Sequence, residues 1–267
     1  ADRIYPGEKR LIAWGKRTEK RGGERGILLE GEKLIGEALD AGHPLEAVWF
    51  TAAFAASKPG VVSRLREANC TVRQVSARVM RWISTQDSPQ GIAAVGPQPG
   101  HIFRRAGDPF SLIVALWLVQ DPGNLGGVIR TADYFGVDEI WLGPGSADPY
   151  GPKALRGSMG AAFRMPVVRT TELGGRIARF RGEGAEVWAA VVGDDRAETS
   201  IGASGARILM IGGESRGLEA RELELADHRV RIPGARRSES LNLAVATGIL
   251  VYLATVGRWN ADKGTER

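Results

Sequence analysis

Short apolar runs alternate with amphipathic helical patterns over the carboxyl-terminal half of the sequence, and this alternation constrains the fold most. The run SLIVALWLVQ (111–120) is almost continuously apolar, as expected for a parallel strand buried on both faces. A helical pattern follows at NLGGVIRTADYFG, and further strands and helices alternate up to a last helix over about 240–256. This order predicts an α/β fold with a mostly parallel sheet between helices.

A second set of strand and helix patterns lies closer to the amino terminus. Strands such as GILLE and GIAAVG and the helix GEKLIGEALDAG predict a small α/β sandwich over 26–96. The stretch that follows is rich in glycine and proline and has no periodicity, so a linker is expected over 97–109. The second domain then covers 110–267.

Residues 1–25 form a basic extension. Of the first 26 residues, eight are Lys or Arg and four are Asp or Glu, whereas the chain as a whole carries a formal charge of +5. A basic segment of this kind suits a polyanion such as RNA. A solvated, partly disordered terminus accounts for the charge equally well.

Several classes of protein are disfavoured by what the sequence lacks. The single cysteine, Cys70, excludes a disulfide framework and a cysteine metal cluster, and it favours the reducing cytoplasm. His43, His101 and His228 have no metal-ligand spacing, so no metal is expected. There is no signal peptide pattern and no apolar run near 18 residues, so no membrane association is expected. Phosphate-loop, dinucleotide-binding and nucleophile-elbow motifs are absent as well.

Three loops in the second domain follow predicted strands, where ligands of open α/β sheets collect. The first contains Asn124, which could serve simply as a helix N-cap, and Arg130, which either lies along the surface or binds an anion. The second is the turn of MIGGESRGL, whose glycines either let the backbone approach a ligand or form an ordinary turn. The third, RIPGARRSESLN, is basic and opens the last helix.

These segments carry a family resemblance. In this order, NLGGVIRTADYFG, IGGESRGL and IPGARRSESLNLAVATGI closely resemble the three motifs of the SpoU (TrmH) family of RNA ribose 2'-O-methyltransferases, part of the SPOUT superfamily. LLEGEKLIGEALDAG and STQDSPQGIAAV are similar to the L30e-like RNA-binding domain of the ribosomal RNA branch. The resemblance spans about 26–256 and implies an L30e-like α/β sandwich followed by an α/β knot domain with a deep trefoil knot.

The resemblance also implies a site, a cofactor and an assembly. The catalytic residues that it implies are Asn124, Arg130, Glu214, Ser240 and Asn242. S-adenosylmethionine would be bound by the backbone around Gly212, Gly213, Gly217, Ile232, Pro233 and Leu241. Members of the family are homodimers with active sites at the subunit interface, so Arg130 is expected to act on the partner's cofactor. No metal is implied.

The sequence departs from the family pattern in the third motif. Gly234 stands where the family often has methionine, and the loop GARRSE is more basic than usual. No group with an assigned chemical role is lost, but the shape of the cofactor pocket is not fixed by the resemblance.

The reaction itself constrains what Arg130 can do. Methyl transfer to a ribose hydroxyl is an in-line displacement during which the hydroxyl loses its proton, yet none of the three motifs contains a histidine. A guanidinium with a pKa above about 12 is a poor base. Arg130 is therefore expected to stabilise the phosphate and the developing alkoxide, while phosphate, water or Glu214 takes the proton.

The L30e-like domain favours large-subunit (23S-type) ribosomal RNA as the substrate. A transfer RNA ribose methyltransferase and a non-catalytic RNA-binding protein remain the alternatives.

Overall fold

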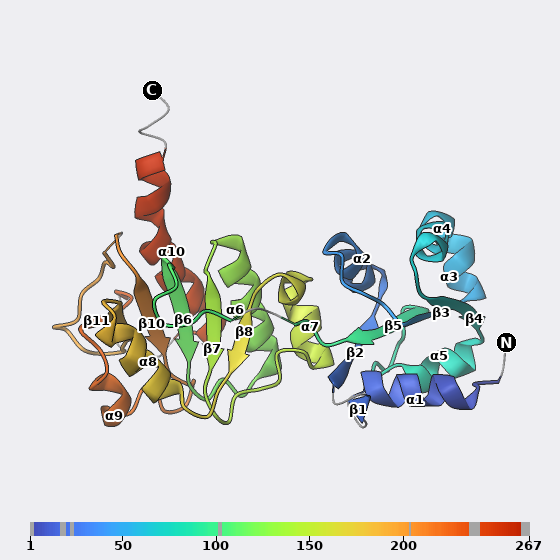
Figure 1. Ribbon diagram of the computed structural model, residues 1–267, viewed down its shortest axis with the longest axis horizontal. Helices are drawn as coiled ribbons and strands as arrows, with labels where there is room; N and C mark the ends of the chain where they lie inside the picture. Colours follow the sequence, from blue (N-terminus) through green and yellow to red (C-terminus); the bar gives the residue numbers. More distant parts are fainter. Residues whose placement is uncertain are drawn as a thin grey trace. The chain divides into compact units, whose positions relative to one another are not determined.

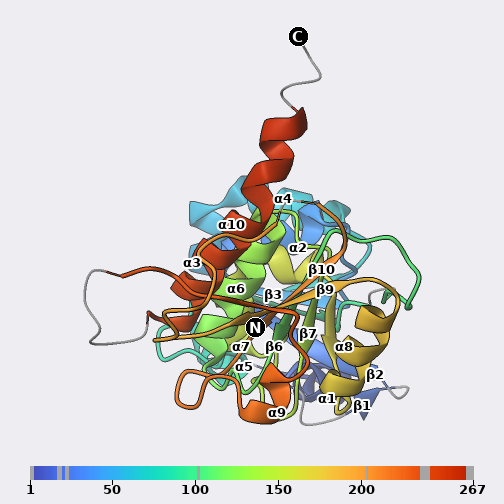
Figure 2. The ribbon, with the colours of Figure 1, turned by 90° about the vertical axis from the view of Figure 1, so that its left-hand side faces the viewer.

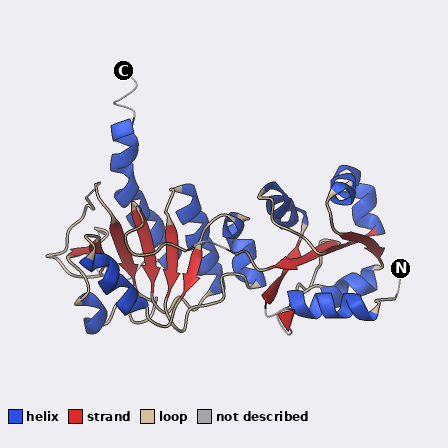
Figure 3. Ribbon diagram, in the orientation of Figure 1, coloured by secondary structure: helices blue, strands red, loops and turns tan. Residues whose placement is uncertain are grey.

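The computed structural model describes residues 3–16, 20–21, 24–100, 103–202, 204–234 and 241–262. The chain divides into two compact units, each with its own sheet (Figures 1 and 3). The first unit comprises residues 1–100 together with 150–163, and the second comprises 101–149 and 164–267. The two units therefore interleave along the sequence.

The first unit contains a five-stranded sheet in the order β1-β2-β5-β3-β4. Strands β3 and β4 are parallel, and the other neighbours are antiparallel. The strands are β1 (Lys20–Arg21), β2 (Glu24–Glu30), β3 (Ala47–Thr51), β4 (Thr71–Val75) and β5 (Ile92–Pro97).

Helices cover both faces of this sheet, as the predicted α/β sandwich requires. Helices α1 and α5 lie on one face, while α2, α3 and α4 lie on the other (Figure 1). Their bounds are α1 (Pro6–Gly15), α2 (Glu32–Asp40), α3 (Ala52–Ser57), α4 (Pro59–Glu67) and α5 (Ala77–Ile83). The unit also includes α7 (Pro152–Ser158) and the short 3-10 helix η1 (Ala161–Phe163), which lie between two strands of the second unit in the chain.

Helix α1 belongs to the folded part of the first unit, although residues 1–25 were expected to be an extension. Ile12 and Trp14 are buried, and Ile12 is part of the core on that face of the sheet. Glu8 fixes the start of the helix by accepting hydrogen bonds from Arg73 and from Trp49 Nε1, the latter at 3.1 Å. The partly disordered terminus therefore does not describe residues 6–15, in which three charged residues are followed by the apolar residues 11–14.

Burial is the largest single effect on the pKa of Glu8, but its hydrogen-bond partners together exceed it. Burial alone would raise the pKa of this carboxyl, but hydrogen bonds from Arg73, the Tyr5 amide and Trp49 outweigh it, so the pKa lies below its usual value. The charged form of Glu8 thus helps to attach α1 to the sheet.

The second unit contains a six-stranded sheet in the order β11-β9-β10-β6-β7-β8. All five strand pairs are parallel, which confirms the expected α/β class. The strands are β6 (Leu112–Leu116), β7 (Glu139–Leu142), β8 (Val167–Arg169), β9 (Glu186–Ala190), β10 (Arg207–Ile211) and β11 (His228–Val230).

Helices flank the parallel sheet on both sides. Helices α6 and α10 lie on one face and α8 on the other (Figure 2). The bounds are α6 (Pro122–Tyr134), α8 (Leu173–Gly182), α9 (Ala220–Leu223) and α10 (Leu243–Asp262). Helices α6 and α10 pack closely, since a Cβ on Gly127 would lie only 3.1 Å from the Ala244 side chain.

The expected knot concerns the path from β11, at the edge of the sheet, to α10, which packs on α6. Residues 235–240 of this connection lie outside the described residues, so the knot stays a prediction.

Part of the expected linker is held to the second unit by hydrogen bonds and an ion pair. The Arg104 amide donates a 3.1 Å hydrogen bond to the buried Glu139 carboxylate, and its guanidinium pairs with Asp138 at 2.9 Å. The Arg104 carbonyl also accepts a 2.7 Å hydrogen bond from Arg176. The segment around Arg104 therefore follows the surface of the second unit.

Candidate functional site

Two of the three loops singled out in the sequence follow adjacent central strands of the second unit. Strand β6 pairs with β10 in parallel register, so the loops after Leu116 and Ile211 leave the same edge of the sheet. The residues immediately before α10 supply the third group of residues. This arrangement positions one polar side chain from each motif within hydrogen-bonding distance of the next.

Asn242 begins this series of hydrogen bonds. Its Oδ1 accepts hydrogen bonds from the Ala244 amide at 3.0 Å and the Val245 amide at 3.2 Å, so it caps the start of α10. Because Oδ1 is thereby fixed toward the helix, Nδ2 faces away from it and donates a 2.9 Å hydrogen bond to Oδ1 of Asn124.

Asn124 continues the series. With Oδ1 occupied by Asn242, its Nδ2 donates to Oε1 of Glu214, which can only accept when ionised. Each amide orientation thus fixes the next. The hydrogen bonds between the three motifs therefore all run in one direction, with Asn242 donating to Asn124 and Asn124 donating to Glu214.

The N-cap of α6 is Asp121 rather than Asn124. The Asp121 carboxylate accepts the Asn124 backbone amide at 2.9 Å, and Pro122 occupies the first turn, where it lacks only a donor that would be unpaired in any case. The interpretation of Asn124 as a simple cap is therefore wrong. Asp121 followed by Pro122 is itself a helix-start signal that could have been read from the sequence.

The turn after β10 is closed by its own backbone. Gly217 has a φ of +64° and its amide donates a 2.9 Å hydrogen bond to the Gly213 carbonyl. A Cβ on Gly212 would lie 2.0 Å from the Gly217 carbonyl carbon, and one on Gly213 would lie 2.7 Å from the Leu118 carbonyl oxygen. The fold itself therefore requires glycine at 212 and 213, because the space that side chains would need is filled by protein backbone.

Leu118 is a residue at this edge that the sequence did not single out. It has a φ of +51°, a conformation that costs a non-glycine residue of order 1–3 kcal/mol. Its carbonyl faces Gly213, and its side chain fills the place where a Cβ on Gly145 would lie. The strained residue therefore joins the loop after β6 to the turn after β10.

Arg130 is not brought to these three side chains within the single chain. It is exposed on α6, six residues and therefore about 9 Å along the axis from Asn124. A rotation of about 100° per residue turns it to a different side of the helix. Arg130 makes no ion pair with any residue that the structure describes.

The remaining predicted residues divide into two groups. Ser240, Arg236 and Arg237 lie outside the described residues. Ile232 is half-buried, whereas Pro233 and Leu241 are exposed. These three flank the undescribed loop on either side.

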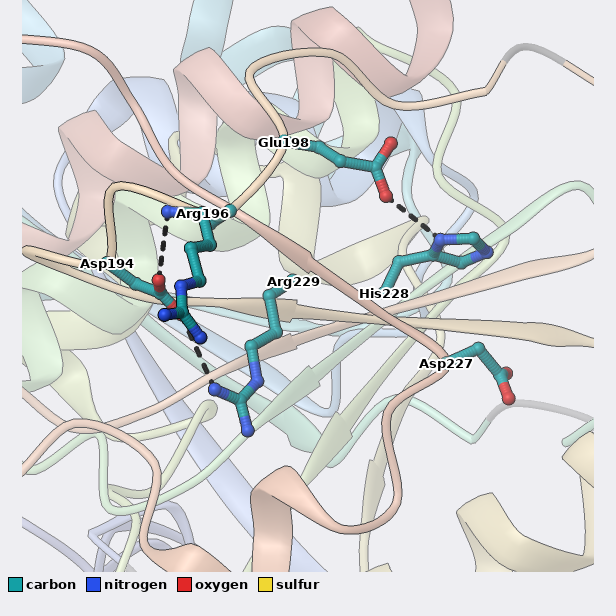
Figure 4. A pocket seen from close by; sticks show the side chains of 7 residues that line it. Asp194, Arg196, Glu198, Asp227, His228 and Arg229 are labelled. Carbon is teal, nitrogen blue, oxygen red and sulfur yellow. Dashed lines mark hydrogen bonds and ion pairs between the residues drawn. The ribbon is translucent and has the colours of Figure 1, made fainter.

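A polar hollow of about 320 Å³ lies along the edge strand β11 (Figure 4). Its charged groups largely satisfy each other, since Asp194 pairs with Arg229 at 3.4 Å and Glu198 with His228 at 2.9 Å. The His228 ring also stacks on Trp188. None of the residues predicted for chemistry lines this hollow.

Three further observations concern the other histidines, metal binding and membrane-spanning helices. His43 Nε2 lies 3.0 Å from the Pro97 carbonyl, a structural contact, and His101 lies outside the described residues. Among the residues described, no group of three or more His, Cys, Asp and Glu side chains could hold a metal ion. No helix in the described ranges combines the length and apolar character needed to cross a membrane.

Comparison with known families gives two matches. Residues 111–252 match the model of the SpoU rRNA Methylase family. Residues 9–94 match the MRM3-like substrate binding domain, and this range includes most of α1.

Individual relatives agree with these matches over nearly the full chain. A tRNA/rRNA methyltransferase of Synechocystis, described as uncharacterized, is 33% identical and covers 92% of this chain and 89% of its own. The 23S rRNA (guanosine(2553)-2'-O)-methyltransferase of Bacillus subtilis is also 33% identical, with 85% and 87% covered. The crystal structure of an AdoMet-bound rRNA methyltransferase from Sinorhizobium meliloti has a TM-score of 0.76 at 30% identity, covering 94% and 95%.

Proposed function

The chain belongs to the SpoU rRNA methylase family, and from this we propose that it methylates a ribose 2'-hydroxyl of large-subunit ribosomal RNA, using S-adenosylmethionine. The enzyme is an RNA 2'-O-ribose methyltransferase of the SPOUT superfamily. The observation that carries the proposal is the hydrogen-bonded series Asn242–Asn124–Glu214, which joins one residue from each family motif at the carboxyl edge of a parallel sheet.

The three side chains suit the task of orienting a ribose hydroxyl and removing its proton. Glu214 is exposed, and only its Oε1 is engaged by a described residue, through Asn124. Oε2 is thus available as the proton acceptor, and we favour it over water or phosphate because the amide of Asn124 fixes its orientation. Asn124 and Asn242 in turn contribute to catalysis by positioning, which can account for several kcal/mol of a barrier.

The residues at this edge suit the methyl donor. When bound, S-adenosylmethionine supplies an activated methyl group on a sulfonium, a cation that favours a nearby carboxylate such as Glu214. Backbone groups of the turn at Gly212, Gly213 and Gly217 would hold it, together with Ile232, Pro233 and Leu241 on either side of the basic loop. Half-buried Ile232 and exposed Leu241 offer apolar surface for an adenine ring.

We propose that the enzyme is a homodimer whose active sites lie at the subunit interface. Apolar side chains are exposed on α6 and α10, with Tyr134 80%, Val245 51% and Tyr252 46% accessible. Arg130 precedes Tyr134 by four residues on α6 and so lies on the same side of the helix. In a dimer formed through these helices, Arg130 would stabilise the phosphate and alkoxide at the partner's site.

Ribosomal RNA is the favoured substrate because the Bacillus subtilis relative is a 23S rRNA methyltransferase and the first unit matches a substrate binding domain. A transfer RNA substrate has no feature of the described residues in its favour. A non-catalytic role would leave no reason for three motif residues to be linked into an ordered series. We propose the cytoplasm as the compartment, since it would suit both an RNA substrate and a chain with a single cysteine.

The experiment that tests the proposal is transfer of labelled methyl from S-adenosylmethionine to total RNA lacking ribose methylation, followed by mapping of the labelled nucleotide. We expect label at a ribose of large-subunit RNA, and none with an Arg130→Ala variant. Label on transfer RNA alone would replace the substrate, and RNA binding without transfer to RNA or ribosomal particles would contradict the proposal.

A further inference from the structure

Helices α1 and α5 cover one face of the sheet in the first unit and turn their other sides to solvent (Figure 1). Ile12 of α1 and Met80 of α5 are buried in the same core, which also contains Trp49 of β3. Because both helices pack on this face, their outward sides form parts of one surface. We refer to the outward sides of α1 and α5, with Lys16 at the end of α1, as the α1–α5 surface.

The α1–α5 surface is positively charged. On α5, Arg78, Arg81 and Trp82 are spaced so that they share one side of the helix, and all three are exposed. On α1, Lys9 and Arg10 are exposed.

The buried Glu30 carboxylate interacts electrostatically with Lys16, but the other cations of this surface are not neutralised in this way. Glu8 is the one acidic residue within 6–15 and 77–83, and it is turned inward to Trp49 and Arg73. None of the four exposed cations on α1 and α5 forms an ion pair with a carboxylate in the part of the chain that the structure describes. Their charge is therefore available to an anionic partner.

Trp82 is held at a fixed place in this positive surface while 49% of it remains exposed. Lys16 Nζ donates a 2.8 Å hydrogen bond to the Trp82 carbonyl, and the ammonium lies 5.5 Å from the indole centroid. The segment immediately after α5 is also fixed, because the buried Glu30 accepts hydrogen bonds from Ser84 and Thr85. Little ordering is thus required before an aromatic ligand can stack on the indole.

We infer that the α1–α5 surface binds a single-stranded segment of the RNA substrate, with a base stacked on Trp82 and phosphates along the arginines and lysines. An exposed aromatic ring beside cations is how proteins recognise unpaired bases, whereas a duplex keeps its base faces covered. The inference rests on the proposed function only in taking RNA as the partner. It adds a substrate-binding surface at a place in the fold that the methyl-transfer chemistry does not use.

The test measures binding of the full-length protein to a labelled single-stranded RNA of mixed sequence, without S-adenosylmethionine, at several salt concentrations. Replacing both Arg78 and Arg81 with Gln should reduce the slope of log Kd against log salt by about 1.4, because two phosphate contacts are lost. The matched control replaces Arg64 and Arg66 with Gln on α4, which covers the opposite face of the same sheet (Figure 1). This control removes the same net charge and should leave the slope near that of the wild type.

Substitution of Trp82 separates stacking from charge. We expect Trp82→Ala to weaken binding of single-stranded RNA by about fivefold or more at constant salt, and Trp82→Phe to retain most of the affinity. Thermal unfolding of each variant checks that the first unit remains folded.

Two results would overturn the inference. One is equal binding by the α5 and α4 double variants, and the other is unchanged affinity of folded Trp82→Ala, as expected if this surface met a protein instead. Since the assay contains no methyl donor, a failure of methyl transfer would leave its result unaffected.

Discussion

Nδ2 of Asn242 donates a 2.9 Å hydrogen bond to Oδ1 of Asn124, which lies 118 residues earlier in the chain. The same Asn242 side chain uses its oxygen to cap α10. One residue therefore serves the stability of a helix with one atom and the geometry of the candidate site with the other.

These two roles can be separated by Asn242→Asp. The carboxylate still caps α10, so the free energy of unfolding should change by less than about 1 kcal/mol. The donor to Asn124 is lost, and methyl transfer should fall by about 10²-fold because the orientation of Asn124 and Glu214 is no longer fixed. Single-turnover kinetics and urea unfolding of the same preparation measure both effects.

The control for this prediction is Asn242→Ala, alone and combined with Asn124→Ala. Alanine removes the cap as well as the donor, so stability should fall by roughly 0.5–2 kcal/mol. If the two asparagines act through one series of hydrogen bonds, the double variant should be little slower than either single variant. Multiplicative losses in rate would show that the residues act independently.

Gly212→Ala should destabilise the second unit strongly. The added Cβ would lie 2.0 Å from backbone atoms of Gly217, which cannot move aside as a flexible side chain can. We expect a loss of about 1–3 kcal/mol or more in the free energy of unfolding. Gly175→Ala in α8 is the matched control, since its Cβ would make only an ordinary contact at 3.8 Å, and it should be neutral or slightly stabilising. Equal effects of the two substitutions would contradict the closed turn.

The first unit should lose stability in acid through Glu30. Burial alone would raise the pKa of this carboxyl, but hydrogen bonds from Ser84, Thr85 and Gln86 outweigh it and leave the pKa below its usual value of 4.5. A lowered folded-state pKa means that the contribution of Glu30 is fully present above about 4.5 and is lost as the pH falls through the folded value. Urea unfolding followed between pH 7 and 3 should show this loss.

Two substitutions test the assignment of the acid sensitivity to Glu30. Glu30→Gln should flatten the dependence of unfolding free energy on pH in the acid range. Thr85→Val removes one hydroxyl donor to the carboxylate, so the folded-state pKa should move closer to 4.5. The total loss of stability in acid should then be smaller than in the wild type and complete at a higher pH. An acid profile identical to that of the wild type in Glu30→Gln would rule out this residue as the cause.

Active sites shared between subunits should allow complementation between two inactive variants. In a mixed dimer of Arg130→Ala and Asn124→Ala chains, one of the two sites combines an intact Asn124 with an intact Arg130 from the partner. Co-expression should therefore restore activity, to about a quarter of the wild-type value for random pairing in a twofold dimer. If each chain uses its own Arg130, no mixed dimer contains a complete site and no activity will return.

Most of the fold could be predicted because buried strands and amphipathic helices have strong sequence patterns. The apolar run 111–120 contains strand β6, observed at Leu112–Leu116, and the expected alternation of strands and helices gave the parallel sheet. Helix α1 was not expected, because its charged residues mask the apolar spacing of Ile12 and Trp14, and α3 and α7 are too short for a clear period. The grouping of 150–163 with the first unit depends on tertiary contacts that no local pattern encodes.

The sequence predicted which loops form the candidate site, but not how their side chains are hydrogen-bonded to one another. The order of the three motifs indicated that Asn124, Glu214 and Asn242 belong together. Which of them donates and which accepts is fixed in the structure, because Asn242 uses its oxygen to cap α10. The left-handed conformation of Leu118 gives no sequence signal, since leucine is not a residue that favours it. The need for glycine at 212 likewise arises from backbone that is nearby only in the folded state.

The interleaving of the two units has a consequence for the way the protein is made. Chains emerge from the ribosome amino end first, and domains usually fold as they emerge. Here the first unit lacks residues 150–163 until part of the second unit has been translated. Asn242, which donates a hydrogen bond to Asn124, is translated 118 residues after it. A nascent chain that stops before α10 therefore holds two of the three linked side chains, and methylation becomes available only once translation of the last helix has begun.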